Sequence, residues 1–201
     1  MKKILPIFSY LFHPLFISVY ASLLYFILFR DFYVLQEMYL FMIQIVIITV
    51  LIPISLFYLL LSLRKIDSIM IEQVSQRKIP ILLNCILLFV LTQKSITLDR
   101  IPELYYFFLG GLFSSILVFI LLLARKKASL HMVGIVALTF FVIGLSNCLE
   151  IPMLYTISTL IVLIGFVASS RLVMKAHTFT ELILGFICGA LPQIIFWPLW
   201  L

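Results

Sequence analysis

The sequence predicts an all-α protein, a polytopic bundle of six to seven transmembrane helices that forms a single domain over residues 1–201. Two observations lead to this prediction. Hydrophobic residues make up 65% of the chain and charged residues only 11%, whereas a soluble domain usually has about a quarter of its residues charged. The hydrophobic residues also fall in runs close to the length of about 20 residues that a helix needs to cross a bilayer.

Seven candidate spans lie between clusters of charged residues. The third is short for a membrane span. The fifth and sixth are separated only by turn-forming residues around Asn147, Glu150 and Pro152, which predicts a tight hairpin between them. The candidate spans are residues 4–29, 38–63, 79–93, 104–124, 131–149, 151–169 and 179–199.

Lysine and arginine are distributed unevenly between the two sides of this arrangement. With seven spans, eleven of the 14 basic residues fall on the side of the N-terminus, and Arg30, Lys94 and Arg100 fall on the other. Because basic residues flanking short loops are retained in the cytoplasm, the sequence predicts a cytoplasmic N-terminus and an external C-terminus. This topology accounts for most of the net charge of +6 without a nucleic-acid partner. The eleven are Lys2, Lys3, Arg64, Lys65, Arg77, Lys78, Arg125, Lys126, Lys127, Arg171 and Lys175.

A group of polar residues between the sixth and seventh spans suggests phosphate chemistry. His177 and Glu181 are four residues apart, so on a helix they share one face. The carboxylate can then hold the Nδ1 proton of the imidazole and leave Nε2 as a free nucleophile or base. Arg171 lies just upstream, and its guanidinium suits phosphate oxygens. Gly185 and Gly189 continue the same face and predict close packing against a neighbouring helix.

Two further polar segments fall on the same predicted side of the membrane. Lys126-Lys127-Ala128-Ser129-Leu130-His131 opens the fifth span, where the start of a helix favours an anion. Arg77-Lys78-Ile79-Pro80 opens the third span. The pattern of apolar runs does not require these segments to share a side, so their agreement predicts one composite site.

These residues resemble the type 2 phosphatidic acid phosphatase superfamily, in its bacterial membrane lipid phosphatase branch, over about residues 64–189. The family has the motifs Lys-x6-Arg-Pro, Pro-Ser-Gly-His and Ser-Arg-x5-His-x3-Asp. The third is matched by Ser170-Arg171-x5-His177-x3-Glu181, with Glu in place of Asp. The second is similar to Ala128-Ser129-Leu130-His131, which lacks the Pro and the Gly. Only the end of the first is present, at Arg77-Lys78-Ile79-Pro80.

The resemblance implies hydrolysis of a lipid phosphate monoester or diphosphate in the bacterial inner membrane, without metal or cofactor. The substrate would be of the phosphatidate, phosphatidylglycerol phosphate, isoprenyl diphosphate or lipid A type, and the sequence leaves the oligomeric state open. His177 would become a phosphohistidine while Glu181 orients it, and His131 would protonate the leaving lipid oxygen. The residues that would bind phosphate are Arg77, Lys78, Ser129, Ser170 and Arg171.

Other interpretations stay open. The altered first and second motifs favour a family member that binds a lipid phosphate, or acts as a scaffold, without turnover. A small transporter or channel is a third possibility, and the scarcity of polar residues along the middle of the spans argues against it. His13, which precedes Pro14 in the first span, matches no motif and is interpreted as a hydrogen-bonded histidine of the bundle. An ionisable residue inside a span is nevertheless costly and usually has a partner.

Overall fold

The computed structural model describes residues 5–67 and 74–201, and over those ranges it contains helices and turns but no strand. The all-α prediction is therefore confirmed. Lys2 and Lys3, which entered the charge count, lie outside the described residues. The elements are α1 (Leu5–Leu11), α2 (Pro14–Leu28), α3 (Leu35–Val46), the π-helical turn η1 (Ile47–Leu51), α4 (Ile52–Ser62), α5 (Val74–Lys94), α6 (Pro102–Leu123), α7 (Leu130–Cys148), α8 (Leu154–Val173), α9 (Phe179–Phe196) and the 3₁₀ turn η2 (Trp197–Leu199).

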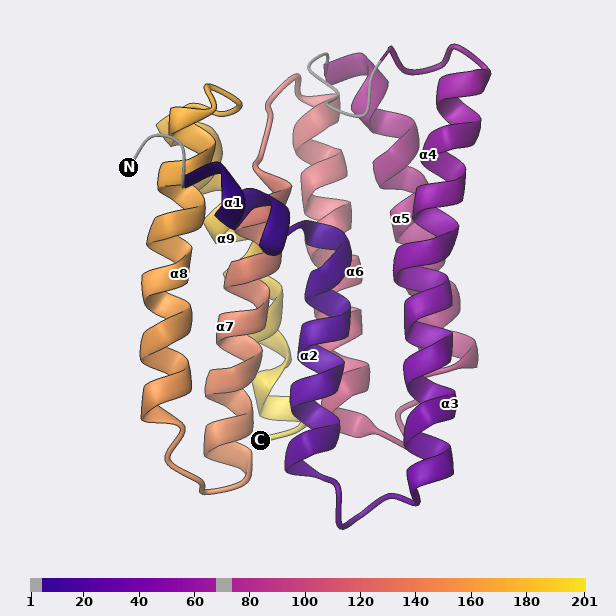
Figure 1. The fold of residues 1–201 in the computed structure, drawn as a ribbon, viewed down its shortest axis with the longest axis vertical. Helices are drawn as coiled ribbons and strands as arrows, with labels where there is room; N and C mark the ends of the chain where they lie inside the picture. The colour runs from indigo at the N-terminus through magenta and orange to yellow at the C-terminus, as the bar shows by residue number, and fades with distance from the viewer. Residues whose placement is uncertain (1–4, 68–73) are drawn as a thin grey trace.

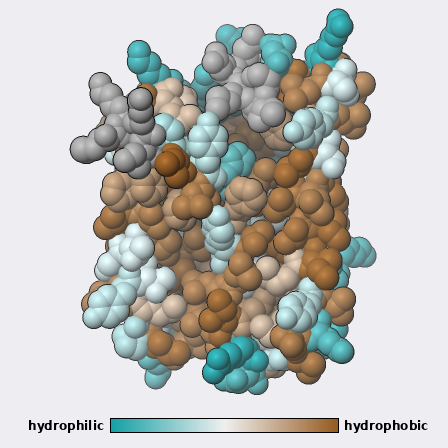
Figure 2. Space-filling view, in the orientation of Figure 1, coloured by the Kyte–Doolittle hydropathy of each residue, from teal (hydrophilic) through white to brown (hydrophobic). Residues whose placement is uncertain are grey.

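Five helical segments in the described ranges are long and apolar enough to cross a membrane, and the bent pair α1–α2 makes a sixth if it counts as one span. The five are the continuous segment Leu35–Ser62, α6, α7, α8 and Phe179–Leu199. Hydrophobic side chains cover much of the middle of the surface, and hydrophilic ones gather toward the two ends (Figure 2). These are the features of a multi-pass integral membrane protein.

The predicted third span lies within α5, which is not among those five segments. Its 21 residues begin with polar side chains around Arg77, which lower the mean hydropathy of the helix. The helix nevertheless packs along α6. It connects the end of the bundle where α4 finishes to the end where α6 begins (Figure 1).

One end of the bundle, here called the site end, holds the ends of α4, α6 and α8 and the beginnings of α5, α7 and α9 (Figure 1). The described basic residues divide between the two ends as predicted, with Arg30, Lys94 and Arg100 at the other end. α6 and α7 lie at the centre of the bundle. α7 packs against α9, α8 and α2, and α5 and α9 both pack against α6. The predicted hairpin is confirmed, because α7 and α8 pack together across a short turn.

The first span is broken, where the sequence predicted one helix over residues 4–29. α1 and α2 meet at an angle of 66°, and His13 between them has an extended backbone with φ −64° and ψ 138°. The physical reason is Pro14, whose ring disfavours a helical conformation in the residue before it. As a result, α1 packs against α8 and crosses the site end instead of prolonging α2 (Figure 1).

The second span is continuous but contains the π-helical turn η1. The ring of Pro53 has no amide proton to donate and would clash with the carbonyl of Thr49 four residues earlier in a regular helix. A wider turn ahead of a proline relieves that clash, and such turns are often found at functional sites. Both Thr49 and Pro53 line the cavity described below.

The close packing predicted for Gly185 and Gly189 is confirmed, and the neighbouring helix is α7. A β-carbon on Gly185 would lie 2.6 Å from the carbonyl oxygen of Ser129, and one on Gly189 would lie 2.5 Å from that of Val133. In addition, the Ser129 amide donates to the backbone carbonyl of Glu181 at 3.0 Å. These contacts fix the beginning of α9 against the beginning of α7, where two of the polar segments lie.

At the site end, a basic residue in a left-handed backbone conformation follows each of three helices. Arg64, Arg125 and Lys175 follow α4, α6 and α8, and each has a positive φ of 53° to 59°. Glycine is the usual residue in this left-handed position after a helix. A basic side chain there lies next to the negative end of the helix dipole. The turn after α8 therefore places Lys175 close to His177.

Candidate functional site

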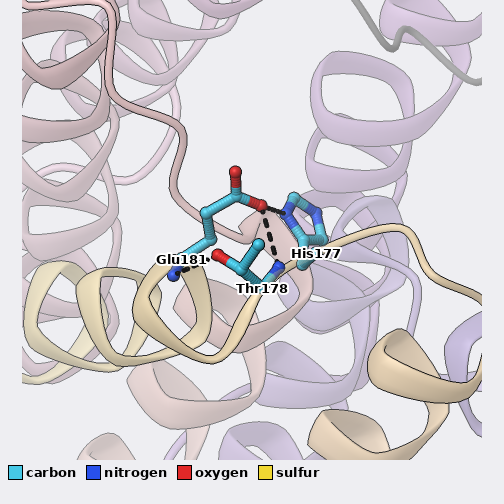
Figure 3. Close-up of polar contacts among 3 residues, drawn as sticks. All are labelled: His177, Thr178 and Glu181. Carbon is cyan, nitrogen blue, oxygen red and sulfur yellow. Dashed lines mark hydrogen bonds and ion pairs between the residues drawn. The ribbon is translucent and has the colours of Figure 1, made fainter.

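His177 and Glu181 make the predicted contact, but not in the predicted way. The imidazole Nδ1 lies 2.8 Å from Glu181 Oε2 (Figure 3). The two residues do not share a helical face, because α9 begins at Phe179 and His177 precedes its N-cap, Thr178. Threonine with glutamate three residues later forms a capping box, which starts a helix at this point.

The capping box gives the Glu181 carboxylate two functions. Its Oε2 accepts the Thr178 amide at 3.2 Å as well as the His177 ring proton (Figure 3). The Thr178 hydroxyl in turn accepts the Glu181 amide at 3.4 Å. The group that fixes the start of α9 thus also fixes the orientation of the imidazole.

His177 is buried and neutral. Its side chain is 3% exposed, and its pKa is lowered from the ordinary value of 6.5, first by burial and then by the positive charges of Arg77 and Arg171, while the Glu181 hydrogen bond opposes this. Because a carboxylate can only accept, the proton of the neutral ring is on Nδ1. Nε2 therefore carries a free lone pair, as a nucleophile requires.

Arg171 lies in the last turn of α8, and its guanidinium has no oxygen acceptor among the described residues. Its Nε is buried without a partner, and Nη1 contacts only the sulfur of Met174 at 3.8 Å. Among the described residues it forms no salt bridge. A half-buried guanidinium whose Nε is buried and unpartnered is costly, so the position favours an anionic ligand.

His131 lies at the start of α7 and contacts α1. Its Nε2 is 3.1 Å from the carbonyl oxygen of Ser9, so Nε2 is the protonated nitrogen of the ring. Ser9 also shares a 2.6 Å hydrogen bond with Ser170. The His13 ring lies 5.2 Å from the His131 ring at 87° to it. Helix α1 and the break after it therefore belong to the site.

A cavity of about 770 Å³ connects these groups with the interior of the bundle. Away from the site end its walls become apolar, and this part of the cavity is lined by Leu56, Phe57, Leu87 and Phe107. Halfway along, the Asn84 amide donates to the Ser115 hydroxyl at 3.0 Å. The cavity is therefore cationic at one end and mainly apolar in the bundle. The basic residues and histidines that line it are His13, Arg77, Lys127, His131, Arg171, Lys175 and His177.

Not all the predicted site residues reach this cavity. His131, His177, Arg77 and Arg171 line it, and Glu181 lines a second hollow of about 390 Å³ that His177 also borders. Lys78, Ser129 and Ser170 do not line the cavity. The Ser170 hydroxyl forms a hydrogen bond with the Ser9 hydroxyl, and the Ser129 amide donates a hydrogen bond to the Glu181 carbonyl. Lys78 follows Arg77 on α5, about 100° further round the helix.

Sequence analysis did not count as site residues several polar residues that line the cavity, including Ser9, His13, Lys127 and Lys175. It assigned the two lysines to membrane topology and His13 to the packing of the bundle. The usable signal was the pair His13-Pro14, which combines an ionisable side chain with a helix breaker inside an apolar run. Ser9 carried no signal, since its contacts depend on the bend that follows it.

Comparisons of the chain with protein-family models, with curated proteins and with solved structures find no significant match. The case for a function rests on the residues themselves.

Proposed function

We propose that the protein is a membrane lipid phosphatase that hydrolyses a phosphate monoester or diphosphate through a phosphohistidine at His177. The observation that carries the proposal is the environment of this imidazole. It is buried and neutral, its Nδ1 is held by Glu181, and it lies near Arg77 and Arg171 on the wall of a cavity that is otherwise mainly apolar.

The residues support a two-step reaction. Nε2 of His177 attacks phosphorus as the bond to the lipid oxygen breaks, and Glu181 stabilises the positive charge that builds on the ring. Arg77 and Arg171 stabilise the phosphoryl oxygens, where charge is spread in the transition state. His131 keeps its Nε2–H on the Ser9 carbonyl, takes up a second proton at Nδ1 when the anionic substrate binds, and gives that proton to the leaving lipid oxygen. It then takes a proton from the water that attacks the phosphohistidine, and this releases phosphate and restores His177.

The apolar part of the cavity supports a lipid rather than a soluble phosphate ester, because it offers an acyl or isoprenyl chain a place inside the bundle. The test is release of inorganic phosphate by detergent-solubilised protein without added metal. Phosphatidate, phosphatidylglycerol phosphate, an isoprenyl diphosphate and a lipid A phosphate are compared side by side. We expect release from at least one of them, and release from none would contradict the proposal.

Orthovanadate is expected to inhibit this activity and EDTA is expected to leave it unchanged. Vanadate adopts the five-coordinate geometry of the transition state, and transition-state mimics bind far more tightly than substrates. His177 would supply its apical nitrogen, and Arg77 and Arg171 would neutralise its oxygens, so no metal enters the proposed reaction. The measurement is the initial rate of phosphate release with each reagent. Activity that disappears with EDTA and returns with magnesium would contradict the proposal.

A second candidate function, binding of a lipid phosphate without turnover, is favoured by one observation. The Ser129 amide, at the start of α7, donates to the Glu181 carbonyl and is not available to a phosphate oxygen. A helix start that has lost a donor in this way stabilises the charge of a transition state less well. Saturable binding of a lipid phosphate with no release of inorganic phosphate would favour this function.

We further propose that the site end faces the cytoplasm, because short basic loops are retained there. In a variant with Cys85, Cys148 and Cys188 replaced by alanine, a cysteine at exposed Thr180 should resist an impermeant maleimide in intact cells. A cysteine at exposed Leu201, at the other end of the bundle, should react. Permeabilised cells provide the control, because both positions should then react. The reverse labelling pattern in intact cells would show that the site end faces outward. The proposed reaction would not be affected by that result.

A further inference from the structure

His13 lies at the joint between α1 and α2 and lines the cavity beside His131. Its Nδ1 accepts the Leu15 amide at 3.4 Å, so it caps α2. A ring nitrogen that accepts a hydrogen bond carries no proton, so the proton of the neutral ring is on Nε2. Within the described residues this Nε2–H has no hydrogen-bond partner.

The two neighbouring histidines are therefore not equivalent. The Nε2–H of His131 is directed at the Ser9 carbonyl oxygen, 3.1 Å away. The Nε2–H of His13 remains available to a ligand in the cavity. Arg171, whose own Nε is buried and unpartnered, is near enough to act electrostatically on both rings. An anion beside Arg171 would thus have a neutral donor within the same cavity.

We propose that His13 is a substrate-binding residue, and that its Nε2–H donates to an oxygen of the lipid phosphate held by Arg171. This assignment rests on the proposed function for the identity of the ligand. It gives the joint between α1 and α2 a direct contact with the ligand. A neutral imidazole is suited to this task, because it stabilises a negatively charged oxygen without giving up its proton.

The competing explanation is that His13 only caps α2, and two substitutions separate the possibilities. Asparagine is among the strongest N-caps, so His13→Asn keeps the cap but is too short to place a donor where the ring does. His13→Ala removes both functions. We expect His13→Asn to keep the thermal midpoint of the parent protein and His13→Ala to lower it.

The functional readout is equilibrium binding of dioctanoyl phosphatidate to protein that carries His177→Ala, so that no turnover interferes. We expect both His13 substitutions to weaken binding by roughly 10- to 100-fold, the loss of one hydrogen bond to a charged group. Dioctanoylglycerol, which has no phosphate, serves as the control ligand, and its binding should be independent of His13. The assignment would be overturned if His13→Asn bound dioctanoyl phosphatidate as tightly as the protein that carries only His177→Ala. It would also be overturned if that His177→Ala protein did not bind dioctanoyl phosphatidate.

The same experiment separates this inference from the proposed function. If no substrate releases phosphate but binding depends on His13, the phosphatase proposal fails and the binding role stands. If phosphate is released and His13→Asn does not change binding, the phosphatase proposal stands and the binding role of His13 fails.

Discussion

Replacing His177 with alanine is expected to lower phosphate release by about a thousandfold or more, the usual effect of removing a catalytic nucleophile. Nε2 of this residue is the atom that would form the bond to phosphorus. The fold should persist, because α9 is capped by Thr178 and Glu181 and not by the imidazole. The measurement is the rate of phosphate release, with circular dichroism to verify helix content. Turnover near the wild-type rate would remove His177 from the reaction.

Glu181→Gln is expected to lower phosphate release less than His177→Ala does. The amide still accepts a hydrogen bond from Nδ1, so the loss of activity should be smaller than for His177→Ala. The carboxylate raises the pKa of His177 against the effects of burial and the two arginines, so its removal lowers that pKa further. The acid limb of kcat/KM, where His177 becomes protonated and inactive, should therefore move to lower pH. A shift to higher pH would contradict the assigned interaction.

Gly189→Ala is expected to destabilise the protein by about 1–3 kcal/mol, the usual cost of overpacking a core. The new β-carbon would meet the Val133 carbonyl oxygen at 2.5 Å and two further backbone atoms of that residue within 3.2 Å. Because backbone atoms cannot rotate away, α9 has to move from α7. The displacement carries Glu181 and His177 away from His131, so activity should fall together with stability. Thermal unfolding in detergent measures the stability.

Gly165→Ala is the matched control, because it makes the same change in a helix of the same bundle. A β-carbon on Gly165 has no neighbour within 4 Å, and alanine has the higher helix propensity. The thermal midpoint should therefore stay the same or rise slightly. A similar fall for both substitutions would show that contact with Val133 is not the cause.

The elements that the sequence predicted well are those whose signal is local. Long apolar runs bounded by charges identify α6 to α9 to within four residues at each end, because crossing a bilayer fixes both length and composition. The contact between His177 and Glu181 was also predictable from spacing. The expected reason for the contact, a shared helical face, was wrong. Thr178 is the N-cap of α9, so the helix begins at Phe179 and His177 lies outside it. Thr178 and Glu181 form an N-cap signature that could have been read in advance.

What the sequence did not predict depends on contacts between distant segments. The bend at His13 follows from Pro14, but its angle and the course of α1 depend on how α1 packs against α8. Ser129 matches the family motif by position, yet the contact between its amide and Glu181 depends on how closely two glycines bring α9 to α7. The residue pattern along a single helix predicts neither the course of α1 nor the contact of the Ser129 amide.

The hydrogen bond between Ser9 and Ser170 joins residues 161 positions apart in the chain. At ordinary synthesis rates of about 5–20 residues per second, roughly ten to thirty seconds separate their emergence from the ribosome. During that interval α1 has no partner from α8, and the lining of the cavity lacks Arg171 and His177. A nascent chain therefore holds an incomplete cavity until its last two helices have entered the membrane. Synthesis that stops before α8 would leave an inserted bundle without either residue.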